Sequence, residues 1–397
     1  MIAPARLAAF QVVRRVFEDG AYADRALAGV SDGLDARDRA LAQRIAYGTV
    51  QRMRTIDYAI ETLGARRVAK LDAPVLAALR TAGYELGWSQ APAHAVADDA
   101  VELVRRAGLE RATGFTNAVA RRLAEGLGEL VASLPEGPLK HSYPDWIFDV
   151  WVRDFGREEA LELMRVQNEP SELVVRSAEP LGEPTDIPGA FRVERLDAAA
   201  LAEGRIWPQS RGSQLAALAV GSRDGERVLD ACAAPGGKAT MLRGAVTAVE
   251  LHAGRARELA ENVRRLGASN VRVVNGDVRA LPDDGFDRAL VDAPCSGLGV
   301  LGRRPDLRWR SRPLPELQLE LLAAAAARTR VGGTIVYSVC TMNADENEAI
   351  VDASGLSVEP LGGEWPVFAH PVRPEFLLTL PHRHGTSGFF IARLRVS

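Results

Sequence analysis

Two cysteines that follow predicted strand ends are the residues in this sequence best suited to covalent chemistry. Cys295 stands in the run Asp292-Ala293-Pro294-Cys295, and Cys340 follows the β-rich run GGTIVYSV. A thiolate is a strong nucleophile where its surroundings lower its pKa, and a nearby carboxylate can hold or deliver a proton. Free cysteines are more often small buried hydrophobes, but the shared strand-end position of this pair favours catalysis.

A cysteine, an acidic group and a general base close together can methylate a carbon that is itself a poor nucleophile, such as carbon 5 of cytosine. Addition of a thiolate to carbon 6 makes carbon 5 enamine-like, so that it can attack a sulfonium methyl group. Asp292, Cys295 and Cys340 supply these residue types, and their spacing does not decide which cysteine is the nucleophile. For Cys232 a structural role is the simpler interpretation, apart from backbone contact with a cofactor.

A glycine turn after the first β-rich run predicts a cofactor site. Gly236 and Gly237 follow the run DACAAP and allow the backbone to turn tightly beside a ligand. Glu250 and Asp277 end the next two runs, where they can accept hydrogen bonds from ribose hydroxyls and an adenine amino group. A glycine pair alone is more often an ordinary turn. Acidic groups at successive strand ends favour a nucleoside, and the lack of GxGxxG spacing argues against a dinucleotide pyrophosphate.

Strands and helices alternate from about residue 206 onward and would position all of these groups. The β-rich runs are RVLDACAA, AVTAVEL, NVRVVNGD, FDRALVDAP and GGTIVYSVC. Helical stretches such as ARELAENVRRLG lie between them. The alternation predicts a mainly parallel α/β sheet, in which ligands bind at the carboxyl ends of the strands.

The preceding residues predict two further domains. In residues 1–125 apolar residues recur at intervals of three and four, which predicts an all-helical domain, and Asp35 and Asp72 precede two of its helices. Residues 126–205 predict a small α+β connector with a helical stretch over 143–168. The predicted domains are therefore 1–125, 126–205 and 206–397.

The composition fits a multidomain globular protein of the cytoplasm. The chain has 397 residues, of which 47% are hydrophobic and 25% charged. Three cysteines without a CxxC pair argue against disulfides and zinc, and we expect no metal, no signal peptide and no membrane segment. The net charge is -3, but residues 1–125 carry 18 basic against 15 acidic side chains, a surplus of +3 that can attract phosphate.

Three motifs, DACAAPGGK, VDAPCSGLGVLGRRPDLRW and YSVCTMNADENEAIV, resemble those of the RNA cytosine-C5 methyltransferases. The N-terminal region resembles the RNA-binding antitermination factor NusB. Together they resemble the bacterial small-subunit ribosomal RNA cytosine-C5 methyltransferases of the Sun/Fmu type over nearly the whole chain. The resemblance implies a NusB-like helical RNA-binding domain, a seven-stranded Rossmann-like methyltransferase domain and S-adenosylmethionine as cofactor. The implied partner is ribosomal RNA, most readily 16S RNA, or a small-subunit assembly intermediate, and we expect a monomer.

The resemblance also assigns roles that spacing does not give. It implies that Cys340 is the nucleophile, that Cys295 serves product release, and that Lys238 approaches the substrate beside Asp292. The segment RRPDLRW would touch RNA near the target base, and Arg255 would brace the cofactor pocket. The expected cofactor-binding residues are Cys232, Ala233, Ala234, Pro235, Gly236, Gly237, Lys238, Glu250, Arg255, Asp277 and Asp292.

The sequence departs from the family pattern at a few positions. Glu250 stands where the family more often has Asp, Val339 replaces a usual Thr, and Ser387 occupies a usually acidic position. The stretch between Lys238 and Glu250 is short, which predicts a truncated first helix.

Two other functions compete with this hypothesis. An amino-group methyltransferase would need a polar-Pro-Pro-aromatic turn after the fourth strand, where Ala293-Pro294-Cys295 stands instead. A catalytically inactive ribosome-assembly or antitermination factor would not require Asp292, Cys295 and Cys340 together.

Overall fold

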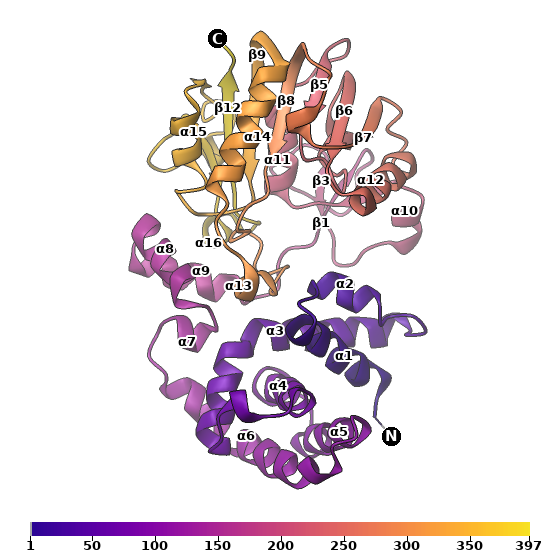
Figure 1. Ribbon diagram of the computed structural model, residues 1–397, viewed down its shortest axis with the longest axis vertical. Helices are drawn as coiled ribbons and strands as arrows, with labels where there is room; N and C mark the ends of the chain where they lie inside the picture. The colour runs from indigo at the N-terminus through magenta and orange to yellow at the C-terminus, as the bar shows by residue number, and fades with distance from the viewer. Residues whose placement is uncertain (1) are drawn as a thin grey trace. The chain divides into compact units, whose positions relative to one another are not determined.

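The computed structural model describes residues 2–397, which divide into two compact units (Figure 1). The first unit comprises the chain up to Asn168 together with the segment Leu301–Arg310. The second comprises Glu169–Val300 and Ser311–Ser397. The boundaries near residues 125 and 205 remain a prediction.

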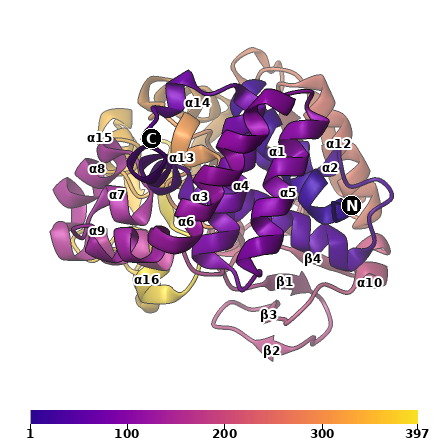
Figure 2. The same cartoon turned by 90° about the horizontal axis from the view of Figure 1, so that it is seen from below.

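The first unit is helical, as the apolar periodicity predicts. Asp35 caps its longest helix, because the carboxylate accepts a hydrogen bond from the N–H of Asp38 at 2.8 Å. The helices α3, α4, α5 and α6 pack in sequence around a shared apolar core (Figure 2). The helices of this unit are α1 (Pro4–Glu18), α2 (Ala23–Ala28), α3 (Ala36–Gly64), α4 (Ala73–Trp88), α5 (Ala93–Arg106), α6 (Thr113–Ser133), α7 (Pro138–His141), α8 (Asp145–Phe155), α9 (Arg157–Val166) and α13 (Leu307–Arg310), with 3₁₀ turns η1 (Val68–Lys70) and η2 (Glu110–Ala112).

The helical stretch predicted over 143–168 is broken in two. Gly156 separates α8 from α9 with a φ of +83°, a conformation that residues with a Cβ rarely adopt. The prediction that this stretch is helical is confirmed over Asp145–Phe155 and Arg157–Val166. The apolar periodicity continues on both sides of the glycine and hides the turn between the two helices.

The segment Leu301–Arg310 packs within the helical unit. Arg308 is 1% exposed, and its guanidinium lies 3.8 Å from the centroid of the Tyr143 ring. Its Nη1 donates a hydrogen bond to the main-chain oxygen of Gln51 at 3.2 Å, and the indole N–H of Trp309 donates to that of Val50 at 2.6 Å. The expectation that this segment touches RNA is therefore wrong for Arg308, because packing against helices buries its charge.

The second unit contains a large α/β sheet with the strand order β10-β12-β9-β8-β5-β6-β7. The five strands from β9 to β7 run parallel, while β12 pairs antiparallel with β9. This confirms the mainly parallel Rossmann-like sheet. Within residues 2–397 the sheet has eight strands rather than seven, because the short β11 also pairs with β12. The strands are β5 (Arg227–Asp230), β6 (Ala245–Glu250), β7 (Val271–Asn275), β8 (Phe286–Asp292), β9 (Thr329–Val339), β10 (Ser357–Glu359), β11 (Leu377–Thr379) and β12 (Phe389–Arg395).

Helices and a second, antiparallel sheet accompany this sheet. Helix α12 packs on β6 and β7, α14 on β8 and β9, and α11 on β9 and β12. The small sheet has the order β2-β3-β1-β4 (Figure 2). These elements are β1 (Val174–Ser177), β2 (Glu183–Pro184), β3 (Ala190–Arg192), β4 (Ile206–Pro208), α10 (Ala198–Ala202), α11 (Arg211–Ala219), α12 (Ala253–Arg265), α14 (Pro315–Arg328), α15 (Glu348–Ser354) and α16 (Pro381–His384), with 3₁₀ turns η3 (Ala239–Met241), η4 (Val278–Ala280) and η5 (Pro366–Phe368).

The first crossover of the sheet lacks a full α-helix. Only η3 stands between β5 and β6, as the short stretch after Lys238 predicts. Among the described residues, no helix combines the length and apolar character needed to cross a membrane.

Candidate active site

The predicted site residues meet at the carboxyl edge of the parallel strands. Asp230 ends β5, Glu250 ends β6 and Asp292 ends β8. Cys340 directly follows β9, and Asp292 pairs in register with Ser338 of that strand. The parallel register therefore brings to one edge groups that lie more than a hundred residues apart in the sequence.

The two strand-end cysteines contact each other. The Sγ atoms of Cys295 and Cys340 are 3.5 Å apart, and both residues are half-buried. The hydrogen bond between them lowers the pKa of Cys340, and the positive charge of Lys238 acts in the same direction. The same hydrogen bond and burial raise the pKa of Cys295. Cys340 is therefore the sulfur that this arrangement favours as a thiolate.

This pairing predicts how Cys340 reacts with an alkylating reagent. The thiolate, which forms above the pKa, is the reactive species. In a Cys295→Ala variant the hydrogen-bond donor is lost, so the pKa of Cys340 rises and its alkylation by iodoacetamide shifts to higher pH. Mass spectrometry of the Cys340 peptide across a pH series measures the midpoint. Cys232 is an internal reference, because burial raises its pKa and keeps it unreactive near neutral pH. An unchanged midpoint would contradict the hydrogen-bond argument.

A buried carboxylate holds the two cysteine loops together. Glu346 is fully buried, and its oxygens accept hydrogen bonds from the N–H of Ser296 at 2.9 Å and from the amide of Gln318 on α14 at 2.9 Å. The hydroxyl of Ser296 also donates to Glu346 and lies 2.8 Å from that of Thr341. Since Ser296 follows Cys295 and Thr341 follows Cys340, Glu346 fixes the separation of the two sulfur atoms.

Sequence reasoning missed Glu346, although a signal was present. The residue lies in the run TMNADENE directly after Cys340, where several polar side chains follow a buried strand. Such a run is normally interpreted as a solvated turn. Its burial depends on α14 and the loop after β8, which come from elsewhere in the chain.

Replacement of Glu346 by glutamine should disturb the cysteine pair. The variant replaces one acceptor oxygen with an NH₂ donor facing other donors, and each buried unsatisfied group costs about 1–3 kcal/mol. We expect a lower thermal unfolding midpoint and an altered pH profile of Cys340 alkylation. Asp345→Asn is the matched control, because Asp345 is the exposed neighbour and its loss should change the unfolding free energy by less than about 0.5 kcal/mol. Equal effects of the two substitutions would show that Glu346 has no special role.

Lys238 and Asp292 form an ion pair beside the cysteines. The Lys238 ammonium lies 2.7 Å from a carboxylate oxygen of Asp292 and 5.0 Å from the centroid of the Phe389 ring. The other carboxylate oxygen accepts a hydrogen bond from the Ser338 hydroxyl at 2.8 Å. The pair is thus held in place close to Cys340. The negative charge of Asp292 raises the pKa of Cys340, and the positive charge of Lys238 lowers it.

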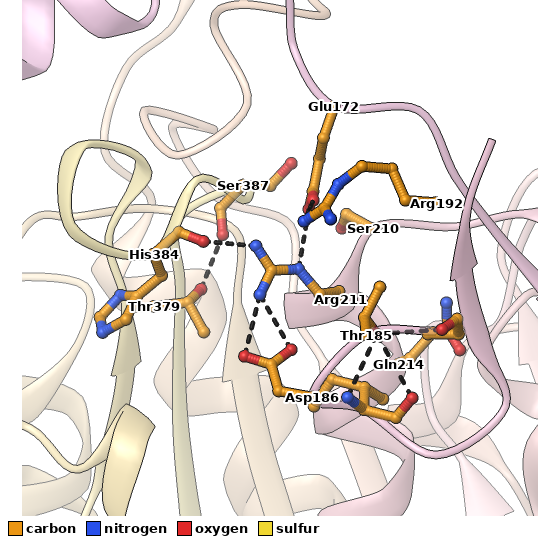
Figure 3. Close-up of polar contacts among 12 residues, drawn as sticks. Glu172, Thr185, Asp186, Arg192, Ser210, Arg211, Gln214, Thr379, His384 and Ser387 are labelled. Carbon is orange, nitrogen blue, oxygen red and sulfur yellow. Dashed lines mark hydrogen bonds and ion pairs between the residues drawn. The ribbon is translucent and has the colours of Figure 1, made fainter. Parts of the chain in front are cut away.

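A polar cluster around Arg211 anchors the loop that precedes Phe389 (Figure 3). Arg211 is 5% exposed and donates hydrogen bonds to Glu172 at 3.0 Å, to Asp186 at 2.8 Å and to the main-chain oxygen of His384. Thr379 of β11 donates to the main-chain oxygen of Ser387 at 2.7 Å and accepts from the N–H of Phe389. These bonds fix both ends of the loop, and with it the ring against which Lys238 lies.

The backbone after β5 forms a close-fitting cradle. Gly236 has a φ of +109°, and a Cβ added there would lie 2.9 Å from a methyl carbon of Leu259. A Cβ on Gly237 would lie 2.7 Å from the indole nitrogen of Trp207. Arg255 braces the turn from α12 by donating to the main-chain oxygen of Ala234 at 3.0 Å. Only glycine therefore fits at these two positions without displacing Leu259 or Trp207.

Acidic groups surround the cradle, and one of them is poised to accept a hydrogen bond. Asp230 is 1% exposed, burial and the nearby Asp292 raise its pKa to about 7, and its Oδ2 has no partner among residues 2–397. Glu250 is buried at the end of β6. Asp277 forms an ion pair with the guanidinium of Arg279 at 2.7 Å, and the hydrogen bond from Arg279 lowers the pKa of Asp277. Asp230 opens the motif that contains the glycine turn and ends the first of the successive strands that carry these acidic groups.

The structure places the predicted cofactor residues in this cradle and at the adjoining strand ends. Cys232, Ala233, Ala234 and Pro235 form the turn, and the N–H of Ala233 donates to the main-chain oxygen of Val249 at 2.9 Å. Within residues 2–397, no group of three or more His, Cys, Asp or Glu side chains is arranged to hold a metal ion.

Two family models match the chain. The model described as 16S rRNA methyltransferase RsmB/F matches residues 217–395, and the model of the NusB family matches residues 3–125. The ribosomal RNA small subunit methyltransferase B of Thermus thermophilus is 34% identical over 90% of this chain and 89% of its own length. The protein of the same name from Xanthomonas campestris is 32% identical over 98% of this chain and 96% of its own.

Solved structures share the fold. The crystal structure of PH0851 has a TM-score of 0.79 and 24% sequence identity, and the match covers 100% of this chain and 99% of that one. A methyltransferase homologue from Pyrococcus horikoshii has a TM-score of 0.56 and 25% identity, covering 66% of this chain and 97% of that one.

Proposed function

Because the chain belongs to the RsmB/F family of 16S rRNA methyltransferases and is therefore a ribosomal RNA methyltransferase, we propose that it methylates carbon 5 of a cytosine through a covalent bond to Cys340. The observation that carries the proposal is the 3.5 Å contact between the Sγ atoms of Cys295 and Cys340, beside the Lys238–Asp292 ion pair. Methylation of an amino group needs no thiol, so a paired thiol site supports methylation at carbon.

The cradle after β5 fits S-adenosylmethionine as the methyl donor. When bound, this cofactor supplies an electrophilic methyl group on a sulfonium sulfur. The close backbone at Gly236 and Gly237 would face its amino-acid part, and Glu250 would accept hydrogen bonds from its ribose hydroxyls. Asp277 would accept from the adenine amino group. The unpartnered Oδ2 of Asp230 provides one more acceptor for a ligand that carries an ammonium or hydroxyl group.

Cys340 begins the reaction on the RNA base. Its thiolate forms a bond to carbon 6, and the electron pair of the 5,6 double bond becomes available at carbon 5. Lys238 and Asp292 act as one hydrogen-bonding unit that stabilises the charge developing toward ring nitrogen 3. Carbon 5 would then bond to the methyl carbon as the bond between that carbon and the sulfonium sulfur of the donor breaks, with its electron pair left on the sulfur. The target cytosine must leave its stack to reach the sulfur, so an unpaired or flipped base is required.

Cys295 acts in the release of the product. A general base takes the proton from carbon 5, the 5,6 double bond re-forms, and the bond between carbon 6 and Cys340 breaks. The leaving sulfur departs more easily when a donor stabilises the thiolate, and Cys295 is the thiol that lies within hydrogen-bonding distance of it. The hydrogen bond that lowers the pKa of Cys340 at rest thus also assists its departure.

Mapping of 5-methylcytosine tests the proposal. The purified full-length protein is incubated with S-adenosylmethionine and with unmodified 16S RNA, either naked or in small-subunit assembly intermediates, and 23S RNA serves as the control. We expect 5-methylcytosine at a defined position of the 16S RNA. Methylation of an amino group, or no product on any of these substrates, would overturn the proposal, and the second result would favour a catalytically inactive assembly factor.

A further inference from the structure

The helical unit contains a cavity of about 590 Å³ that the proposed methyl-transfer chemistry does not use. Its wall is built from three helices: Arg6 lies on α1, Arg44 on α3, and Tyr84 and Trp88 on α4. Its volume falls within the roughly 300–1,000 Å³ that is usual for small-ligand sites. The cavity can therefore accept one flat, nucleotide-sized group.

Two aromatic rings form part of the apolar surface of the cavity. Tyr84 and Trp88 are one helical turn apart, their ring centroids are 6.4 Å apart, and their planes differ by only 12°. The Tyr84 ring lies directly on the backbone of α3, because a Cβ added to Gly48 would come within 2.1 Å of it. The glycine therefore makes room for the ring in this position. Exposed aromatic faces stack nucleobases with little regard to sequence.

The charges of the cavity are distributed unevenly. The Arg6 guanidinium pairs with two carboxylates, Glu85 at 2.9 Å and Asp99 at 2.8 Å, so this cluster offers no positive charge to a ligand. Arg44 is exposed and has no hydrogen-bond or ion-pair partner among residues 2–397. The guanidinium of Arg52, which is not part of the lining, lies 5.1 Å from the centroid of the Trp88 ring. Arg6 is thus already paired within the wall, and Arg44 is the cation of the lining that solvent can reach.

We propose that this cavity binds one unpaired nucleotide of the RNA substrate, with its base stacked on Trp88 and Tyr84 and its phosphate paired with Arg44. The inference rests on the proposed function, because it takes RNA as the substrate. Positive charge attracts phosphate of any sequence, and stacking requires a base that has left its own helix. The cavity is therefore a recognition site for single-stranded RNA that is built from residues separate from the cysteine site.

Binding of a short fluorescein-labelled single-stranded RNA and of a duplex of the same sequence, followed by fluorescence anisotropy, tests the proposal on the full-length protein. Trp88→Leu keeps an apolar side chain but removes the ring, and should weaken single-strand binding on the order of 10- to 100-fold. Arg44→Gln removes only an exposed charge, so its effect cannot come from misfolding, and it should reduce the slope of log affinity against log salt by about one. Arg121→Gln is the matched control, because Arg121 is exposed on α6, away from the cavity wall.

Each outcome bears on one claim. Loss of single-strand affinity in Trp88→Leu and Arg44→Gln, with wild-type affinity in Arg121→Gln and unchanged thermal unfolding, supports the site. In methylation of 16S RNA the first two variants should then show a raised KM and an unchanged kcat. Wild-type affinity for single-stranded RNA in both cavity variants overturns the proposal, because the cavity then does not bind RNA. Failure of the wild-type protein to form 5-methylcytosine would count against the proposed function instead, since the binding measurement needs no methyl transfer.

Discussion

Replacement of Cys340 by alanine should abolish methylation of the RNA, with a loss on the order of 10⁴-fold or more. The reason is chemical: without the thiolate, carbon 6 receives no nucleophile and carbon 5 stays too poor in electrons to take the methyl group. The measurement is the rate of 5-methylcytosine formation on 16S RNA under single-turnover conditions. Because Cys340 is half-buried and small, removal of its sulfur should leave the fold intact.

Binding of S-adenosylmethionine is the control for this variant. The cradle at Gly236 and Gly237 does not depend on the Cys340 sulfur, so the Kd of the cofactor should change by no more than a few-fold. A variant that binds the cofactor normally and still forms 5-methylcytosine at a rate within tenfold of the wild type would rule out Cys340 as the nucleophile.

Replacement of Cys295 by alanine should instead give an enzyme that forms its covalent bond to RNA but does not break it. The thiol that stabilises the departing Cys340 sulfur is lost, so elimination slows more than addition does. We expect a protein–RNA adduct that survives denaturing electrophoresis and accumulates in proportion to the cofactor supplied. The wild-type protein should show little adduct at steady state, because its release step is fast.

The double variant Cys295→Ala with Cys340→Ala distinguishes this adduct from nonspecific crosslinking. It should form none, because the sulfur that bonds to carbon 6 is absent. An adduct in Cys340→Ala but not in Cys295→Ala would reverse the two roles. The spacing of the cysteines left that alternative open, and the lowered pKa of Cys340 argues against it.

The elements of regular pattern could be predicted from the sequence. The strand before Asp292 is a buried run of the length that a parallel sheet requires, and its end locates the carboxylate without further information. Asp35 gave the start of α3 because its side chain caps the helix locally. Both predictions depend on neighbours within a few residues, which is the range over which sequence patterns are informative.

Features that depend on distant contacts could not be predicted. Glu346 is recognisable as a positioning residue only after α14 and the Ser296 loop have been brought to it. The burial of Arg308 depends on Tyr143 and Gln51, which lie far away in the sequence. The contact between the two cysteines could be predicted only in part. The predicted strand ends put both residues at one edge of the sheet, but the 3.5 Å distance between their Sγ atoms depends on the three-dimensional structure.

The placement of Leu301–Arg310 with the helical unit has a consequence for any attempt to separate the two units. The chain passes between the two units at residues 168/169, 300/301 and 310/311, so neither unit is encoded by one uninterrupted stretch. A recombination event that removed the N-terminal helices would leave the buried Arg308 without Tyr143 and Gln51. No single cut of the chain therefore yields either unit by itself, because each unit is completed by a segment that lies beyond part of the other.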